Sequence, residues 1–252
     1  AGLIKLAEAF HERKFAWVAD TIYDAHLSRG ARMVLISGPS SSGKTTSAKR
    51  LGIQLGVLGL NPVLISLDDY FVDREKPPRD ADGNYDYEAL EAIDLELFND
   101  HLARLIRGES VDIPRYDFIT GRRTWHNAPL TLDERSILII EGIHGLNPAL
   151  SEGLHTDAIY RVFVSALTCL NLDDHNRIRT TDVRLLRRIV RDMQFRATPP
   201  NNTLSLCPPR RRNVDFPLSG ERRPHVQHRP ALRAARPAPL CLRSLEGDSA
   251  GE

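Results

Sequence analysis

The sequence predicts an α/β fold, a three-layer sandwich with a mainly parallel central sheet. Four short apolar runs have the pattern of buried strands, and they cover residues 32–37, 62–71, 136–142 and 158–165. Stretches with helical periodicity separate them, and strands that alternate with helices form parallel sheets joined by right-handed crossovers. With 252 residues, of which 41% are apolar, the chain is long enough for one sizeable core.

The helices and loops follow from the spacing of apolar residues and from glycine. Residues 1–31 carry apolar side chains near helical spacing, which predicts one or two amphipathic helices that lead into the main domain. Further helices are expected over residues 45–59 and 87–108, each ending at a glycine, and a basic helix over residues 173–195. The polar segment 72–86 is expected to be a loop, and residues 110–117 and 124–132 to be short strands around a turn at Gly121.

Composition excludes several classes of protein. The net charge of +1 argues against a whole-protein field that attracts nucleic acid or acidic membranes. The cysteines Cys169, Cys207 and Cys241 are odd in number and far apart, which argues against a disulfide framework or a zinc site and favours a reducing cytoplasm. No run approaches the roughly 18 to 20 apolar residues that span a bilayer, and the charged first residues do not fit a secretion signal.

Residues 207–252 differ in character from the rest of the chain. They are rich in arginine and proline, contain no lysine and have one aromatic residue. This composition buries too little apolar surface to order itself, so a disordered tail is expected. A second interpretation stays open. Arginine, proline and alanine have GC-rich codons, so a GC-rich gene read out of frame after codon 206 would give the same composition.

The segment "GPSSSGKT", Gly38 to Thr45, fits the phosphate-binding pattern G-x-x-x-x-G-K-[ST] and lies between a predicted strand and a predicted helix. In this pattern, backbone N–H groups surround phosphate oxygens, the lysine reaches the β and γ oxygens, and the last hydroxyl binds Mg²⁺. The fold is therefore expected to be that of a P-loop NTPase, with ATP and Mg²⁺ as cofactors. The candidate ATP-binding residues are Gly38, Pro39, Ser40, Ser41, Ser42, Gly43, Lys44, Thr45 and Thr46.

Acidic residues end two of the predicted strands. Asp68 and Asp69 lie at the carboxyl end of the second, at the sheet edge where open α/β folds bind ligands. A carboxylate there can accept the proton of an attacking hydroxyl, or it can merely cap the next helix. Glu141 ends the third strand, where it can hold Mg²⁺ together with Thr45.

The predicted basic helix contains Arg184, Arg187, Arg188 and Arg191 at steps of three and four residues, followed by Arg196. A subset therefore shares one face and can close over transferring phosphates as an arginine-rich lid. The other interpretation is a solvated charged face.

Six segments, in order, resemble the uridine kinase and phosphoribulokinase family of P-loop kinases: "GPSSSGKTTSAKRL", "ISLDDYF", "GNYDYEALEAIDLELF", "VDIPRYDF", "ILIIEGIHGLNP" and "DDHNRIRTTDVRLLRRIVRD". The resemblance covers residues 32–202 and implies a kinase domain at 32–206. It is closest to bacterial uridine-kinase-like proteins, in which such a domain often follows domains like those of threonyl-tRNA synthetase. A start at Ala1 rather than Met would suit a piece of such a chain.

The resemblance also implies roles for residues. Asp68 matches the catalytic base, Tyr85 and Asp86 the pair that holds nucleoside base and ribose, and Tyr116 a tyrosine that contacts the base. Arg184 and Arg187 match lid arginines, with Arg184 also touching substrate. Two departures accompany these matches: Gly121 stands where uridine kinases have a base-reading histidine, and the tail does not look like the family's C-terminal strand and helix.

The expected activity is Mg²⁺-dependent transfer of the γ-phosphate of ATP to the 5′-hydroxyl of uridine or cytidine. Alternatives are another small acceptor (pantothenate, a sugar phosphate or glycerate) and a catalytically impaired module that binds a nucleotide or RNA. The expected partner is a small-molecule substrate, and a homo-oligomer stays open. Specific nucleic-acid binding and membrane binding are not expected.

Overall fold

The computed structural model describes residues 2–79, 83, 85–151, 156–165, 173, 175–176, 178–196, 198–205 and 241–244. The chain divides into two compact units, each described by itself. One comprises Ala1–His11 with Ala166–Cys241, and the other comprises Glu12–Ser165 with Leu242–Glu252.

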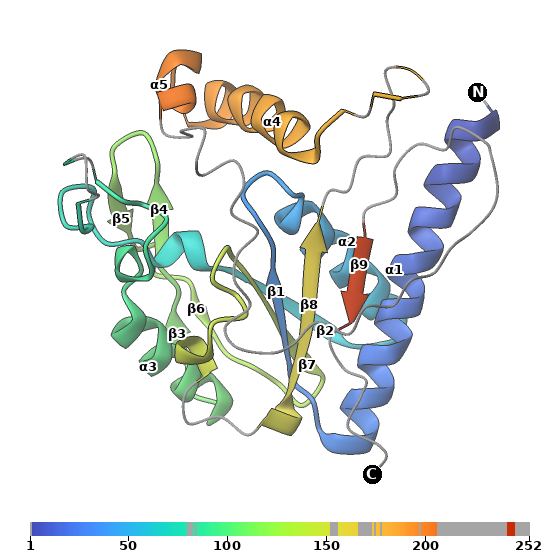
Figure 1. Ribbon diagram of the computed structural model, residues 1–252. Coiled ribbons are helices and arrows are strands. Elements are labelled where there is room, and N and C mark those ends of the chain that lie inside the picture. Colours follow the sequence, from blue (N-terminus) through green and yellow to red (C-terminus); the bar gives the residue numbers. More distant parts are fainter. Residues whose placement is uncertain are drawn as a thin grey trace, which may run out of the picture. The chain divides into compact units, whose positions relative to one another are not determined.

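The larger unit is built on a parallel sheet (Figure 1). Its strands β1 (Met33–Ser37), β2 (Asn61–Ser66), β7 (Ser136–Glu141) and β8 (Ile159–Ser165) lie in the order β2-β7-β1-β8. β1 pairs in parallel with β7 and β8, and β2 pairs in parallel with β7. The short β9 (Cys241–Ser244) is adjacent to β8 in the sheet order. The four predicted strands and their parallel arrangement are confirmed, but the second strand ends at Ser66 and not at Phe71, because residues 67–70 turn into a 3₁₀ helix.

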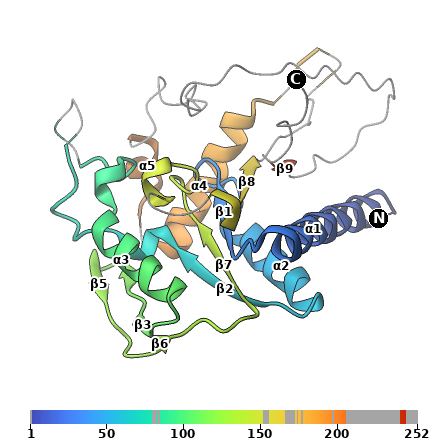
Figure 2. The same ribbon diagram turned by 90° about the horizontal axis from the view of Figure 1, so that it is seen from below.

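Helices cover both faces of this sheet, as Figures 1 and 2 show. α2 (Lys44–Val57) and the part of α1 (Gly2–Arg29) that belongs to this unit, residues 12–29, lie on one face, and α3 (Leu95–Ile106) lies on the other. Gly52 of α2 is packed so closely on the sheet that an added Cβ would lie 3.3 Å from the Leu64 side chain. All five residues of β1 are buried, as expected of a parallel strand that is covered on both sides.

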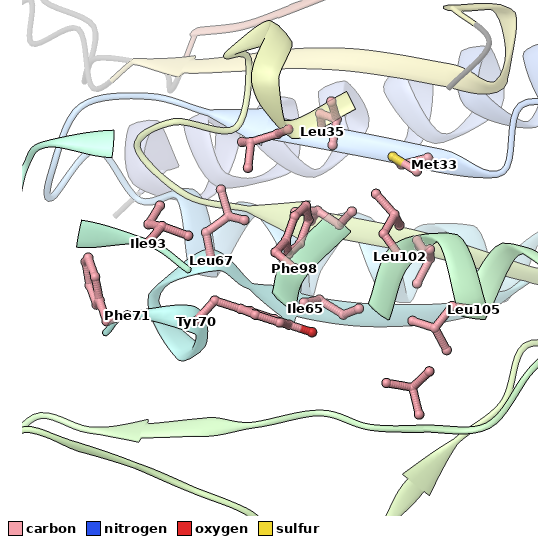
Figure 3. Packing of buried hydrophobic residues seen from close by; sticks show 14 of the residues in the cluster. Met33, Leu35, Ile65, Leu67, Tyr70, Phe71, Ile93, Phe98, Leu102 and Leu105 are labelled. Carbon is pink, nitrogen blue, oxygen red and sulfur yellow. The ribbon is translucent and has the colours of Figure 1, made fainter. Parts of the chain in front are cut away.

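The core between the sheet and α3 comes from alternate strand residues (Figure 3). Met33 and Leu35 of β1 face Phe98 and Leu102 of α3, whereas Val34 and Ile36 are buried outside this cluster. Each of these side chains contributes about 1.5–3 kcal/mol by leaving water, so the sheet and α3 are firmly joined. The 3₁₀ helix η1 (Leu67–Tyr70), directly after β2, belongs to the same cluster.

The prediction for the helix over residues 87–108 was right in kind and wrong at its start. A 3₁₀ turn, η2 (Leu90–Ala92), comes first, and α3 begins only at Leu95. Ile93 instead makes an antiparallel bridge with Phe71, and the Val72 N–H donates to the Ala92 carbonyl at 2.9 Å. Asp94 then caps α3 by accepting the Leu97 N–H at 3.1 Å. Long-range pairing therefore replaces the first helical turns.

The two predicted short strands form two separate ladders. β3 (Val111–Asp112) pairs with β6 (Pro129–Leu130), and β4 (Arg115–Asp117) pairs with β5 (Arg122–Thr124), both antiparallel. The turn at Gly121, which has a φ of 70°, is confirmed. The expected strand over 124–132 is interrupted because Asn127 has a φ of 50° and donates its N–H to the Asp112 carboxylate.

The other unit contains α4 (Thr180–Phe195) and α5 (Pro200–Ser205). α4 begins later than the expected Asp173, because the Asp173 carboxylate accepts the N–H groups of His175 and Asn176 in a local turn that competes with a helix. In the larger unit, two further 3₁₀ turns, η3 (Pro148–Ser151) and η4 (Thr156–Ala158), precede β8 in the chain.

Most of the predicted tail, 207–240 and 245–252, lies outside the described residues, so its two interpretations stay predictions. Among the described helices, none combines the length and the hydropathy that a membrane span requires.

Candidate active site

The Gly-rich segment forms a tight turn between β1 and α2. A Cβ on Gly38 would lie 2.1 Å from the Val164 carbonyl oxygen, so only glycine fits there. Ser41 and Gly43 have left-handed backbones, with φ of 59° and 99°. Such residues turn successive N–H groups toward one point and create a concave anion site. The sequence pattern therefore adopts the conformation that its chemistry requires.

The polar groups of this turn fit a phosphate chain. The Ser41 and Ser42 hydroxyl oxygens are buried and have no hydrogen-bond partner among the described residues. The ammonium group of Lys44 donates to the Pro39 carbonyl at 3.3 Å, which holds it over the turn. No side chain caps α2 at Gly43, and the N–H groups of a first helical turn have no partners within the helix. An anion with several oxygens would satisfy these donors.

Glu141 lies at the end of β7, level with Ile36 of β1 and Ser66 of β2. One carboxylate oxygen, Oε1, accepts hydrogen bonds from Thr45 Oγ1 at 2.8 Å and from Ser66 Oγ at 3.1 Å. Burial raises the pKa of Glu141, as does the Asp68 charge, while Lys44, Thr45 and Ser66 act in the opposite direction. The charges of Lys44 and Asp68 therefore both act on this carboxylate.

This oxygen set fits Mg²⁺. A carboxylate and a hydroxyl are the hard ligands that Mg²⁺ takes, and it usually binds one or two carboxylates plus phosphate oxygens and waters. In the part of the chain that the structure describes, no group of three or more His, Cys, Asp and Glu side chains could hold a metal. A site that the nucleotide completes is consistent with the Thr45–Glu141 pair.

Asp68 and Asp69 are consecutive in η1 but have different surroundings. Asp69 Oδ1 accepts the backbone N–H of Tyr116 at 3.2 Å. Burial raises the pKa of Asp69, the Tyr116 N–H lowers it, and the neighbouring Asp68 raises it further. Asp68 is the one whose charge reaches Glu141. The two carboxylates thus serve different neighbours, a distinction that the sequence "LDDY" does not make.

Two of the three residues matched to acceptor binding lie in the segment after η1. Tyr85 bridges Arg79, whose guanidinium lies 4.4 Å from the centre of the Tyr85 ring and donates to its hydroxyl at 3.1 Å. Asp86 accepts the Glu88 N–H at 3.0 Å. The predicted loop 72–86 is therefore shaped by specific contacts.

Tyr116 lies in β4 and is mostly buried, with 7% of its surface exposed. Its ring packs edge-on against Phe71 at 5.6 Å and Phe118 at 5.2 Å. This aromatic cluster joins β4 to η1.

The space beside Gly121 is filled by the side chain of Arg74, a residue that the sequence pattern did not single out. A Cβ on Gly121 would lie 2.7 Å from Arg74 Nε. The Arg74 N–H donates to the Gly121 carbonyl at 3.0 Å, and its guanidinium donates to the Phe118 carbonyl. A side chain at position 121 would therefore compete with Arg74 for the same space.

The arginines of α4 separate into two sets. Asp192, which is buried, pairs with Arg188, Arg191 and Arg196, with N–O separations of 3.6, 2.6 and 3.9 Å. It also accepts the hydroxyl of Thr203 in α5 at 3.4 Å. Arg188 and Arg196 are four residues before and after Asp192, a spacing that could have identified this cluster. The two arginines matched to the lid, Arg184 and Arg187, belong to the same helix and unit.

His144 is another residue that sequence reasoning did not single out. It lies three residues after Glu141, and its Nε2 donates to the Glu88 carbonyl at 3.0 Å. Burial lowers its pKa. His144 thus connects the segment after β7 to the segment that contains Asp86.

Comparison with known proteins agrees with this geometry. The family model described as Phosphoribulokinase / Uridine kinase family matches residues 33–205. The chain is 30% identical over 170 residues to a uridine kinase from Deinococcus deserti, covering 67% of this chain and 72% of that protein. It is 31% identical over 159 residues to a uridine kinase from Halobacterium salinarum, covering 63% of this chain and 61% of that protein.

Among solved structures, one described as a fructose transport system kinase from Silicibacter sp. TM1040 superposes with a TM-score of 0.51 at 20% identity. It covers 77% of this chain and 87% of that chain, and supports the fold alone. The family model and the relative of 30% identity confirm the family to which the six motifs point. The chain therefore belongs to the phosphoribulokinase/uridine kinase family and is a small-molecule kinase that works by ATP-dependent phosphoryl transfer.

Proposed function

We propose that the chain transfers the γ-phosphate of ATP to the 5′-hydroxyl of uridine or cytidine. The observation that carries the proposal is that Glu141, at the end of β7, accepts hydrogen bonds from Thr45, which follows Lys44, and from Ser66, two residues before Asp68. Phosphate-binding, metal-binding and proton-accepting groups thus converge at the carboxyl ends of β1, β2 and β7, where open α/β sheets bind ligands. The relatives named uridine kinase support the acceptor.

In this proposal, the backbone N–H groups of residues 40–46 and the Lys44 ammonium hold the phosphates of ATP, while Gly38 and Pro39 shape the turn. Thr45 and Glu141 hold Mg²⁺, which neutralises phosphate charge when bound. The family resemblance assigns to Arg184 and Arg187 the role of adding positive charge for the transferring phosphoryl group.

Asp68 accepts the proton of the acceptor hydroxyl as that oxygen bonds to the γ-phosphorus and the bond to the β-phosphate oxygen breaks, which releases ADP. Asp86 accepts hydrogen bonds from ribose hydroxyls, and Tyr85 and Tyr116 contact the base. Catalysis is then mostly positioning and charge neutralisation, as in other phosphoryl transfers.

A second acceptor class is favoured by one observation. Two arginine side chains lie near positions that the family resemblance links to the acceptor: Arg74 fills the space beside Gly121, where uridine kinases have a histidine, and the Arg79 guanidinium covers Tyr85. Guanidinium recognises carboxylates and phosphates with paired hydrogen bonds. An acceptor with an anionic group, such as a sugar phosphate, glycerate or pantothenate, would suit them.

The test is a panel of acceptors incubated with ATP and Mg²⁺, with ADP release as the readout. Uridine and cytidine should be turned over, and the same panel with Lys44→Ala measures contaminating activity. Turnover of an anionic acceptor and of no nucleoside would favour the second class. If no acceptor raises ADP release above the Lys44→Ala background while ATP still binds, the chain is an impaired nucleotide-binding module.

A further inference from the structure

We propose that Asp69 is a positioning residue that, with Asp94, fixes the β4–β5 hairpin relative to Asp68. This proposal rests on the proposed function, in which Asp68 accepts the proton of the acceptor hydroxyl and Tyr116 contacts the acceptor. Asp69 does not touch the reacting atoms in this assignment. It acts on the reaction through the hairpin that carries Tyr116.

The first contact is on β4. Asp69 Oδ1 accepts the Tyr116 N–H at 3.2 Å, although the two residues are 47 positions apart in the chain. β4 pairs on one side with β5, so this carboxylate satisfies a backbone donor on the side away from β5. Phe71, two residues after Asp69, packs against the rings of Tyr116 and Phe118 at 5.6 and 6.3 Å. A polar and an apolar contact therefore hold β4 against η1.

The second contact is on β5. Arg123 is the register partner of Tyr116. Its two terminal nitrogens both donate to Asp94 Oδ2 at 3.0 Å. The Arg123 and Asp94 side chains are 16% and 31% exposed, so water screens this pair less than a surface ion pair. The two strands of the hairpin are thus each held by one carboxylate.

The backbone segments that carry the two carboxylates are hydrogen-bonded to each other. The Asp94 N–H donates to the Tyr70 carbonyl at 2.9 Å, and Phe71 bridges Ile93 in antiparallel fashion. Asp94 is fixed further because its Oδ1 caps α3. Asp69 and Asp94 therefore bind the two members of one cross-strand pair, Tyr116 and Arg123. We call these two carboxylates the clamp.

This clamp is adjacent to the proposed base. Consecutive Cα atoms are about 3.8 Å apart, so a hairpin bound to Asp69 is bound to the chain one peptide unit from Asp68. A misplacement of about 1 Å between reacting groups can cost on the order of 100-fold in rate. Loss of the Asp69 contact should therefore loosen the acceptor relative to Asp68 and leave the phosphate-binding turn in place.

The experiment compares Asp69→Ala with Asp69→Asn. The alanine variant lacks an acceptor for the Tyr116 N–H and should raise the acceptor KM about tenfold or more, with the ATP KM within about twofold of wild type. The asparagine variant keeps an oxygen that can accept the Tyr116 N–H. Its KM for the phosphate acceptor should therefore be close to the wild-type value. Amide hydrogen exchange should be faster at Tyr116 in the alanine variant and close to wild type in the asparagine variant.

Asp133→Ala is the matched control, because Asp133 accepts the Ser136 hydroxyl at 2.6 Å ahead of β7 and is remote in sequence from the clamp. It should lower stability without changing the ratio of the two KM values. Three results overturn the proposal: an acceptor KM in Asp69→Asn as high as in Asp69→Ala, an equal rise of the acceptor and ATP KM values in Asp69→Ala, or unchanged exchange at Tyr116. If wild type releases no ADP with any acceptor, the proposed function fails, and the exchange at Tyr116 still decides whether Asp69 holds the hairpin.

Discussion

The phosphate-binding turn and the acceptor side of the larger unit are built in different ways. The turn consists of consecutive residues, and its shape comes from the backbone: Gly38 is too close to Val164 for a side chain, and Ser41 and Gly43 are left-handed. The proposed acceptor side combines η1, the segment with Tyr85 and Asp86, and the β4–β5 hairpin. Its shape comes from side-chain contacts such as Asp69 with Tyr116 and Arg123 with Asp94.

This difference in construction matches a difference in the substrate that each region is proposed to bind. A backbone-defined turn binds the group that all kinases of this kind share, the phosphate chain, and tolerates little change. An acceptor side held by side chains from separate segments can change by substitution, as Arg74 beside Gly121 illustrates. Substitutions on the two sides should therefore have separable effects on the two substrates.

The largest expected effect is that of Asp68→Asn, because an amide cannot accept the proton of the attacking hydroxyl. The kcat should fall by about two to four orders of magnitude with little change in the KM for ATP. Steady-state ADP release over a range of both substrates measures this. An active Asp68→Asn together with an inactive Asp69→Asn would exchange the roles assigned to the two carboxylates.

Lys44→Ala should lower kcat by about 100- to 1,000-fold, because it removes positive charge from the transferring phosphates. The melting temperature should stay close to wild type, since Lys44 is not part of the core. Lys49→Ala, an exposed lysine of the same helix, is the matched control and should retain activity. Unchanged ADP formation in Lys44→Ala would contradict the assignment of the turn.

Asp86→Ala should act on the acceptor alone. Loss of a charged hydrogen bond of about 1.5–3 kcal/mol corresponds to an increase of the acceptor KM by about 10- to 150-fold, with an unchanged KM for ATP. Glu91→Ala, an exposed acid nearby in sequence, is the control. Equal changes in both KM values would show that Asp86 shapes the segment through Glu88 instead of binding the acceptor.

The smallest effect concerns stability and pH. The pKa of Glu141 is raised above its ordinary value of 4.5, so ionising this carboxyl in the folded protein is unfavourable. Its stabilising contribution is complete below the unfolded pKa and is lost as pH rises through the folded pKa. Glu141→Gln should therefore match or exceed wild type in melting temperature at pH 7 without Mg²⁺, and the difference should shrink toward pH 4.

Asp133→Asn should show the opposite pH dependence of stability. The hydrogen bond from Ser136 lowers the pKa of Asp133, so its contribution is present above the unfolded pKa and is lost as pH falls. The variant should be less stable than wild type at pH 7, with a difference that disappears in acid. A Glu141→Gln variant that behaves in the same way would mean that the Glu141 charge is compensated in the folded protein.

Much of the scaffold could be predicted because its determinants are local. The strand before Gly38 and the helix after Gly43 follow from apolar period and glycine position, and acids at strand ends follow from the parallel sheet. The family resemblance added Tyr85, Asp86, Tyr116 and the lid arginines, whose roles remain predictions. Periodicity did not find the start of α3, because Ile93 pairs with Phe71 instead of continuing a helix.

By itself, the sequence determined the position of the phosphate-binding turn, the alternation of strands and helices that forms a parallel sheet, and the family. Each depends on residue types within a few positions of one another, where backbone sterics and hydrophobic period decide the outcome. Only the tertiary structure decided which of two adjacent aspartates binds Tyr116, that Asp94 pairs with Arg123 and what fills the space beside Gly121. These pairings join residues on different elements or turns, and a hydrogen bond or ion pair forms only where folding brings donor and acceptor within about 3 Å.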